Sequence, residues 1–366
     1  MHIGLARRGY SPTGGAESYL RRLVAALAAK GHAPTLFASP EWPRDQRPAE
    51  AGFETVRGRG PASFATGLER SEARRRCDLL FSLERVWRCD CYRAGDGVHR
   101  AWLERRTGFE PGWRGVLRRW NPKHCQLLAL EESLFGQGGA GFVIANSHLI
   151  RDEITAHYPA YPPERIAVVY NGLPPGRFQP AAPEQRARAR QAFGLEPDDF
   201  ILLFAGTGWE RKGFACALTA VARLPDSARA RLLVAGRGNP RPYRRQAGRA
   251  RFLGPVRDMA SIYAAADLFV LPTLYDPFSN ACLEALAAGL PVLTTRANGF
   301  AEVLAAGVDG DVFDAGDDAA LASLALGWSD PARRQAARPL CARKAAAFSI
   351  ERNVNTTLAI LARLAQ

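Results

Sequence analysis

The sequence predicts an α/β protein made of two doubly wound domains, each with a parallel sheet covered by helices. Its 366 residues exceed what a single core usually supports. Short apolar strands alternate with amphipathic helices from residue 2 onward, and the alternation restarts near residue 200 after a proline-rich stretch. With 47% apolar and 23% charged residues, the composition is that of an ordinary globular protein with enough material for two cores.

The first half opens with a strand, a helix and a second strand. Residues 2–6 predict a buried strand, residues 16–32 a helix ended by Gly31, and residues 34–39 the next strand. Further strands are expected at 77–83, 141–147 and 165–172, with a helix at 148–159. The first connection contains Gly14 and Gly15, which let the backbone approach a ligand at the helix N-terminus, although a plain tight turn fits equally well.

The second half repeats the pattern. Strands are expected at 200–208, 230–236, 249–256, 267–273 and 291–295, and helices at 213–225, 259–266 and 282–289. We therefore expect an N-terminal domain at 1–172, a linker at 173–183, a C-terminal domain at 184–346, and a final helix within 347–366 that packs back on the N-terminal domain.

Two carboxylates flank the start of one predicted helix in the second half. Asp276 lies in the connection after the strand at 267–273, where Pro277 disfavours helical geometry, and Glu284 lies within the first helical turns. Ligands of such sheets bind beyond the carboxyl ends of the strands, and the free amides at a helix start attract anions. A nucleotide-sugar, with a diphosphate between hydroxyl-rich ends, fits this arrangement. A turn-forming Asp and a solvated Glu explain the spacing equally well.

Cations follow an earlier strand of the same half. Gly206 and Gly208 allow a close turn, after which Arg211 and Lys212 supply two positive charges. Such a pair suits a departing diphosphate. Adjacent surface cations before a helix are the plainer interpretation.

The segment "DPFSNACLEALAAGLPVLTT" resembles the E-x7-E segment of retaining glycosyltransferases of family 4, which have the GT-B architecture of two facing Rossmann-like domains. The resemblance implies that Asp276 binds the donor sugar, that the amides of Asn280 and Ala281 approach the sugar or diphosphate, and that Glu284 holds the ribose. Asp276 stands where the family pattern has Glu, which shortens the reach by one methylene.

Other segments extend the resemblance over most of the chain. "FAGTGWERKGF" matches the family's Arg/Lys pair, and "VVYNGLPPGRFQP" implies that Arg177 points toward the phosphates. Within the family, the chain is most similar to lipopolysaccharide core glucosyltransferases that act on inner-core heptose, which implies that Asp96, in "CYRAGDGVH" beside His99, lies near the reacting centre. An Asp-Gly turn is the alternative for Asp96. The residues expected to be catalytic are Asp96, Arg177 and Lys212.

The resemblance implies retaining transfer of a hexose, with UDP-glucose the favoured donor, to a hydroxyl of a lipid-linked or lipopolysaccharide saccharide. No metal and no other cofactor are expected, since "DGD" at 309–311 matches a metal-binding DxD poorly and reads as a turn. Asp96 acting as the base of an inverting enzyme, or a nucleotide-sugar hydrolase or epimerase of the same fold, stays open. Nucleic-acid binding is disfavoured, because no recognition motif accompanies the basic residues.

Charge and composition indicate where the protein works. The net charge is +13, and residues 99–124 combine seven Arg or Lys with three Trp, a mixture typical of anionic membrane surfaces or of a solvated basic face. No run of residues is apolar enough to span a membrane, and the seven cysteines have no paired spacing. We expect a cytoplasmic protein docked peripherally on the inner face of the cytoplasmic membrane.

Overall fold

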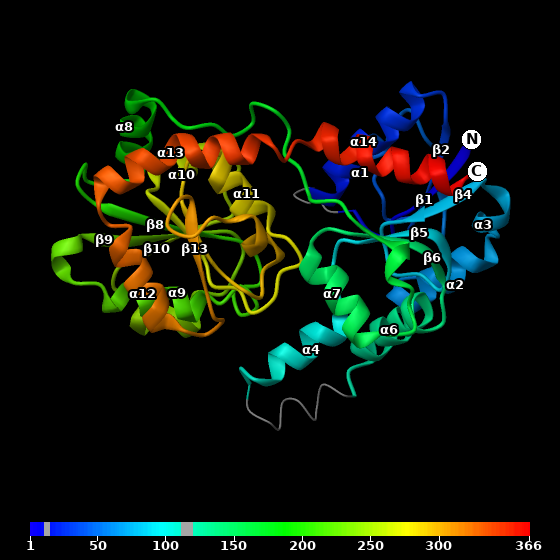
Figure 1. The fold of residues 1–366 in the computed structure, drawn as a ribbon, viewed down its shortest axis with the longest axis horizontal. Helices are drawn as coiled ribbons and strands as arrows, with labels where there is room; N and C mark the ends of the chain where they lie inside the picture. Colours follow the sequence, from blue (N-terminus) through cyan, green and yellow to red (C-terminus); the bar gives the residue numbers. More distant parts are fainter. Residues whose placement is uncertain (11–14, 111–119) are drawn as a thin grey trace. The chain divides into compact units, whose positions relative to one another are not determined.

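The structure is a computed structural model. It describes residues 1–10, 15–110 and 120–366. The chain divides into two compact units: unit 1 comprises Met1–Tyr170 and Ile350–Gln366, and unit 2 comprises Asn171–Ser349. Each unit holds one sheet, whose paired strands are parallel and whose connections run through helices, as the α/β prediction requires (Figure 1).

The sheet of unit 1 has seven strands in the order β3-β2-β1-β4-β5-β6-β7. The strands are β1 (His2–Ala6), β2 (Ala33–Ala38), β3 (Gly52–Thr55), β4 (Leu79–Ser82), β5 (Cys89–Ala94), β6 (Ala140–Ala145) and β7 (Ile166–Val168). The helices are α1 (Gly15–Ala29), α2 (Pro61–Arg70), α3 (Ala73–Arg76), α4 (His99–Thr107), α6 (Pro122–Glu131), α7 (His148–His157) and α14 (Ile350–Leu364), with short turns at η1 (Arg44–Gln46), η2 (Glu132–Gly136) and η3 (Pro163–Arg165).

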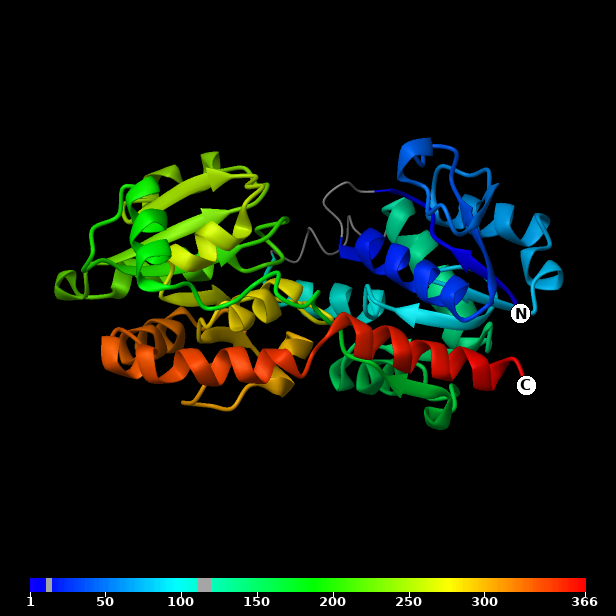
Figure 2. The ribbon, with the colours of Figure 1, turned by 90° about the horizontal axis from the view of Figure 1, so that it is seen from above.

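The last helix, α14, is part of the core of unit 1. It lies beside α1 in both views (Figures 1 and 2). Its residues Ile350, Val354, Leu358 and Leu361 recur at helical spacing and are buried in the cluster that includes α1 and strands β1, β2 and β4. Each such side chain contributes about 1.5–3 kcal/mol on burial. The chain therefore returns to unit 1 after completing unit 2.

The sheet of unit 2 has six strands in the order β10-β9-β8-β11-β12-β13. The strands are β8 (Phe200–Ala205), β9 (Ala230–Ala235), β10 (Ala250–Gly254), β11 (Leu268–Leu271), β12 (Val292–Thr295) and β13 (Gly310–Phe313). The helices are α8 (Pro183–Ala192), α9 (Phe214–Arg223), α10 (Met259–Ala265), α11 (Asn280–Ala287), α12 (Asp318–Gly327) and α13 (Pro331–Ala346), with turns η4 (Asp226–Ala228), η5 (Arg241–Gln246) and η6 (Gly299–Val303).

Helices cover both faces of this second sheet. Helices α9 and α12 pack together on one face, whereas α8, α10, α11 and α13 lie on the other (Figure 1). The central strands β8 and β11 are buried along their whole length, which explains why they appear in the sequence as continuous apolar runs. The strand order reverses between β8 and β11, so their carboxyl ends form the switch point where ligands bind in such sheets.

The structure corrects several sequence expectations. Strands β3 and β5 were not predicted. Of residues 309–311, expected to form a turn, Asp309 does lie in a turn, whereas Gly310 and Asp311 begin strand β13. Asp311 lies in that strand and accepts a hydrogen bond from the indole of the fully buried Trp328 at 2.7 Å. All seven cysteines are free in the structure.

Gly213, which precedes α9, should be far less tolerant of substitution than Gly208. Both have positive φ (+71° and +72°), but a Cβ on Gly213 would lie 1.8 Å from the carbonyl oxygen of Pro272, whereas one on Gly208 meets nothing within 4 Å. We expect Gly208→Ala to cost about 1–2 kcal/mol through backbone strain alone, and Gly213→Ala about 2–5 kcal/mol. Urea unfolding of both variants measures the difference, and equal losses would show that the close approach to Pro272 is not a constraint.

Candidate functional site

The loop after β8 is joined to the loop after β11 through its backbone. The carbonyl of Arg211 accepts hydrogen bonds from the Leu274 amide at 2.8 Å and from the Thr273 hydroxyl at 3.0 Å. The Arg211 guanidinium in turn donates to the carbonyl of Tyr275 at 3.1 Å. Because β8 and β11 are neighbours in a parallel sheet, the two loops meet at the carboxyl edge of unit 2.

An ion pair between Lys212 and Asp276 crosses these two loops. Their side chains are only 12% and 8% exposed, so water screens the pair weakly. Asp276 is held by its backbone as well, since its amide donates to Ala297 at 3.0 Å and its carbonyl accepts from Gly299 at 2.9 Å. Gly206 lies against the Lys212 stem, which a Cβ there would approach at 3.6 Å. The structure thus brings together two residues that the sequence assigned to one ligand.

Helix α11 begins directly after this acid, as expected. Ser279 caps the helix by accepting from the Cys282 amide at 3.4 Å, and Asn280 is its first residue. The amides of Asn280 and Ala281 have no carbonyl partner within the helix, because they belong to its first turn. The Asn280 side chain accepts from Asn171 at 2.9 Å.

A second carboxylate, Glu284, lies on the same helix and pairs with a tyrosine. Its Oε2 accepts a hydrogen bond from the hydroxyl of the buried Tyr263 at 3.0 Å. Burial raises the pKa of Glu284 above its usual range, while the Tyr263 hydrogen bond and the charge of Arg177 lower it. Arg177 itself is exposed, and its guanidinium stands 5.3 Å from the ring of Phe178, which meets Tyr263 edge-on. Glu284 is therefore not the solvated helix residue of the alternative interpretation.

Asp96 lies in unit 1, at the turn that follows β5. Its side chain is 70% exposed and stands 3.9 Å from the buried Arg85. Arg85 is fixed by Glu131 at 3.1 Å and by the carbonyl of Gly97 at 2.6 Å, and Asn146 holds the turn by donating to Gly95 at 3.3 Å. Asp96 is thus both a turn residue and a carboxylate at the carboxyl edge of the unit 1 sheet.

His99, beside this turn, is the first residue of α4. The amides of His99 and Arg100 both donate to the carboxylate of Glu131, which is fully buried and so caps α4. The ring of His99 lies 2.9 Å from a nitrogen of His124, and burial, the nearby Arg85 and His124 lower the pKa of His99 to about 3. His99 is therefore neutral at physiological pH.

Several residues of these two edges were not identified from the sequence. Asn298 is buried, and its side chain accepts from the amides of Ser279 at 3.2 Å and Phe300 at 3.1 Å, which shapes the loop before α11. Tyr263 and the Arg85–Glu131 pair were also missed. In the sequence, Asn298 is marked only by the Asn-Gly pair that it forms with Gly299. Tyr263, Arg85 and Glu131 are marked only as isolated polar residues among apolar ones.

The last predicted site residues are the two glycines before α1. Gly15 is the first residue of α1, whereas Gly14 lies outside the described residues. Within the described ranges, no three His, Cys, Asp or Glu side chains are close enough to hold a metal ion together. Of the helices in the same ranges, none is both long and apolar enough to cross a membrane.

Two family models match separate parts of the chain. The model described as Glycosyltransferase Family 4 matches residues 13–177, and the model described as Glycosyl transferases group 1 matches residues 199–328. The first match falls in unit 1 for most of its length, and the second falls within unit 2.

Individual relatives cover nearly the whole chain. A lipopolysaccharide glucosyltransferase of Escherichia coli (strain K12), WaaG, is 27% identical over 322 residues, which are 83% of each chain. A crystal structure of WaaG superposes with a TM-score of 0.81 at 22% identity, over 98% of this chain and 99% of that one. HepE of Anabaena, in complex with UDP-glucose, gives a TM-score of 0.74 at 19% identity, over 99% and 100%. The GT-B prediction is confirmed by these superpositions.

Glu284 should lower the stability of the protein at neutral pH. Since its pKa is raised in the native state, the native state holds the proton more tightly than the unfolded chain. Protonated Glu284 therefore adds to the free energy of unfolding at low pH, and this added stability is lost as pH rises through the native pKa. We expect Glu284→Gln to melt a few degrees higher than the wild type at pH 7.5, with the difference vanishing near pH 4. The exposed Glu196→Gln is the control in thermal unfolding. A lower melting temperature at pH 7.5 would mean that Tyr263 and Arg177 outweigh burial.

Proposed function

Because the chain belongs to the family 4 glycosyltransferases and folds as GT-B, we propose that it transfers glucose from UDP-glucose to a hydroxyl of the lipopolysaccharide core, with retention at the anomeric carbon. The donor and acceptor are inferred from two sources. The E. coli relative is a lipopolysaccharide glucosyltransferase, and the Anabaena neighbour was crystallised with UDP-glucose. The residues of the carboxyl edge of unit 2 supply the physical argument.

The observation that carries the proposal is the order of charges along that edge. Lys212 and Asp276 form a largely buried pair, the first-turn amides of α11 follow, and Glu284 lies one helical turn beyond them. Cations and amides suit a diphosphate, whereas each carboxylate can accept two hydrogen bonds from neighbouring hydroxyls. The sequence of groups therefore matches a sugar, a diphosphate and a ribose in turn.

We infer that the donor exchanges partners with the ion pair. Lys212 would move its charge from Asp276 to the diphosphate, which frees the carboxylate to bind sugar hydroxyls. Arg211 has donors beyond the one it gives to Tyr275, and Arg177 is exposed beside Glu284. These three cations and the α11 amides stabilise the charge that develops as the C1–O bond to the diphosphate breaks. The same cations are the reason to propose a transfer that needs no metal.

Retention follows from attack on the face that the diphosphate leaves. The acceptor oxygen bonds to C1 as the leaving diphosphate oxygen takes the acceptor's proton, so neither a covalent nucleophile nor a protein base is required. We propose that the exposed Asp96 orients the acceptor, supported by Arg85 through the turn. An α-linked product identifies retention, and a β-linked product would instead assign Asp96 as the base of an inverting enzyme.

We also propose that unit 1 docks on the anionic cytoplasmic face of the inner membrane, where a lipid-linked acceptor is found. Phe109 and Trp120 are 45% and 81% exposed and lie on either side of residues 111–119, which fall outside the described ranges. The arginines of α4 lie nearby in sequence. Aromatic side chains with cations favour the headgroup region of a bilayer.

Lys212→Met should weaken UDP-glucose binding by about tenfold, since a charge-assisted hydrogen bond to phosphate is worth about 1.5–3 kcal/mol. Thermal shift with a panel of nucleotide-sugars identifies the donor, and calorimetry measures how much affinity for UDP-glucose the Lys212→Met variant loses. The exposed Lys30→Met is the matched control. Equal binding by Lys212→Met and wild type would reject the site, and release of free glucose with every saccharide tested as acceptor would indicate a hydrolase.

Trp120→Ala should reduce co-sedimentation with phosphatidylglycerol vesicles, because the exposed indole loses its place at headgroup depth. Leu326→Ala, which removes an apolar side chain that is 45% exposed from α12 in unit 2, should have no effect. Binding of the wild type that is no greater to phosphatidylglycerol than to phosphatidylcholine vesicles would contradict the docking proposal.

A further inference from the structure

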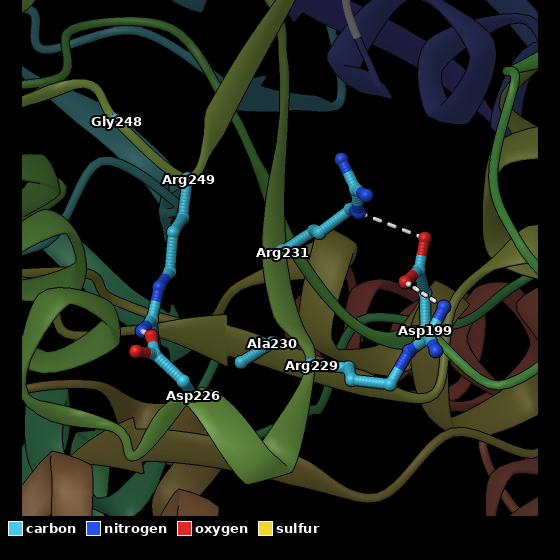
Figure 3. A pocket seen from close by; sticks show the side chains of 7 residues that line it. All are labelled: Asp199, Asp226, Arg229, Ala230, Arg231, Gly248 and Arg249. Carbon is cyan, nitrogen blue, oxygen red and sulfur yellow. Dashed lines mark hydrogen bonds and ion pairs between the residues drawn. The ribbon is translucent and has the colours of Figure 1, made fainter.

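A cavity of about 370 Å³ lies at the amino edge of the unit 2 sheet, opposite the edge that holds Lys212 and Asp276. Asp199 immediately precedes β8, Arg229 precedes β9, and Arg249 precedes β10, so the amino ends of three parallel strands form its wall. Figure 3 shows Arg229 and Arg231 beside the Asp199 carboxylate, with Arg249 reaching to Asp226.

The charged groups of this cavity are not equally engaged. Arg249 is used structurally, because it donates to the carbonyls of Val221 at 3.3 Å and Leu224 at 2.7 Å and pairs with Asp226. Arg231 gives only its Nε to Asp199, at 2.8 Å, and Arg229 only one Nη, at 3.5 Å. These two side chains are 53% and 51% exposed. Since a guanidinium has five N–H groups, most of their donors remain available to a ligand.

The lining of the cavity carries an excess of positive charge. Arg229, Arg231 and Arg249 line it together with two acids, Asp199 and Asp226. Nine arginines and neither Asp nor Glu occur between Asp226 and Asp258, the stretch that supplies these arginines. An excess of one sign in a hollow concentrates oppositely charged solutes there.

Arg229 also occupies an unfavourable backbone conformation. Its φ of +47° lies in the left-handed region, and among the described residues Glu72 is the one other non-glycine residue with positive φ. Glycine would adopt this conformation without strain. The chain instead has an arginine here, whose side chain reaches the cavity wall, which is a reason to expect that its charge is used.

We propose that this cavity binds a phosphate-bearing ligand through Arg229 and Arg231. A phosphate group offers three oxygens and thus accommodates two guanidinium groups at once. The ligand is either a soluble phosphate compound or the headgroup of a phosphate-monoester lipid. The cavity shares no residue with the edge that holds Lys212 and Asp276, so this proposal can be tested independently of the proposed transferase activity.

The test is a titration with inorganic phosphate at constant ionic strength, balanced with chloride, followed by thermal shift. We expect phosphate to raise the melting temperature of the wild type and of Lys212→Met, which removes a cation of the donor edge. Arg231→Gln should bind phosphate about tenfold more weakly. Arg229→Gly should lose most of the response while melting in chloride at or above the wild-type temperature, because it relieves the backbone strain. A purely structural arginine would instead lower that temperature.

A second arm distinguishes the two sources. Co-sedimentation compares vesicles containing phosphatidic acid with vesicles containing phosphatidylglycerol at equal charge. A response to free phosphate assigns a soluble ligand, and Arg229-dependent binding to phosphatidic acid without that response assigns a lipid headgroup. An unchanged phosphate response in both arginine variants, loss of the response in Lys212→Met alone, or no response to phosphate or to phosphatidic acid would overturn the proposal.

Discussion

The arrangement of the carboxyl edge of unit 2 depends on one interaction, the ion pair between Lys212 and Asp276. It connects the loop after β8 with the loop after β11, the two strands at which the strand order reverses. The backbone bonds between Arg211 and Leu274 and between Asp276 and Gly299 hold the partners in place. Because both loops are fixed in this way, the start of α11 and its first-turn amides are held beside the same pair.

Such a pair contributes little net stability, since removing two charges from water costs nearly what their attraction returns. Glu284 follows the same logic, because burial works against its charge while Tyr263 and Arg177 support it. We therefore propose that these groups serve ligand binding rather than folding. In unit 1, by contrast, the fully buried carboxylate of Glu131 has a structural role, which is to cap α4 and fix Arg85.

Much of the fold could be predicted from the sequence because buried parallel strands appear as apolar runs and some helices begin at a capping side chain, such as Ser147, Asp258 and Ser279. Strand β5 was not predicted because its sequence, "CDCYRA", contains the charged residues Asp90 and Arg93. The Asp90 carboxylate accepts a hydrogen bond from the Leu80 amide of the neighbouring strand at 2.8 Å. No local sequence pattern reveals such a contact. Strand β13 was not predicted because Gly310 and Asp311, its first two residues, are typical of a turn.

The candidate site was predictable only in its residue types. The spacing of Asp276 and Glu284 predicted acids on different elements, and the structure places them so. The residues that pair with these acids could not be predicted. Lys212 and Asp276 are 64 residues apart, and Tyr263 and Glu284 are 21 residues apart. Pairings at such separations are set by the sheet order. The role of Asn298 was hidden for the same reason, since its side chain bonds to the Ser279 amide 19 residues away.

The measurement that tests partner exchange most directly is calorimetric binding of UDP and of UDP-glucose to the wild type and to Asp276→Asn. If the donor draws Lys212 away from Asp276, the variant should bind UDP at least as tightly as the wild type, because Lys212 has no carboxylate to leave. Its Kd for UDP-glucose relative to UDP should then rise about tenfold, reflecting the lost hydrogen bonds to the sugar. Parallel weakening of UDP and UDP-glucose would contradict the account.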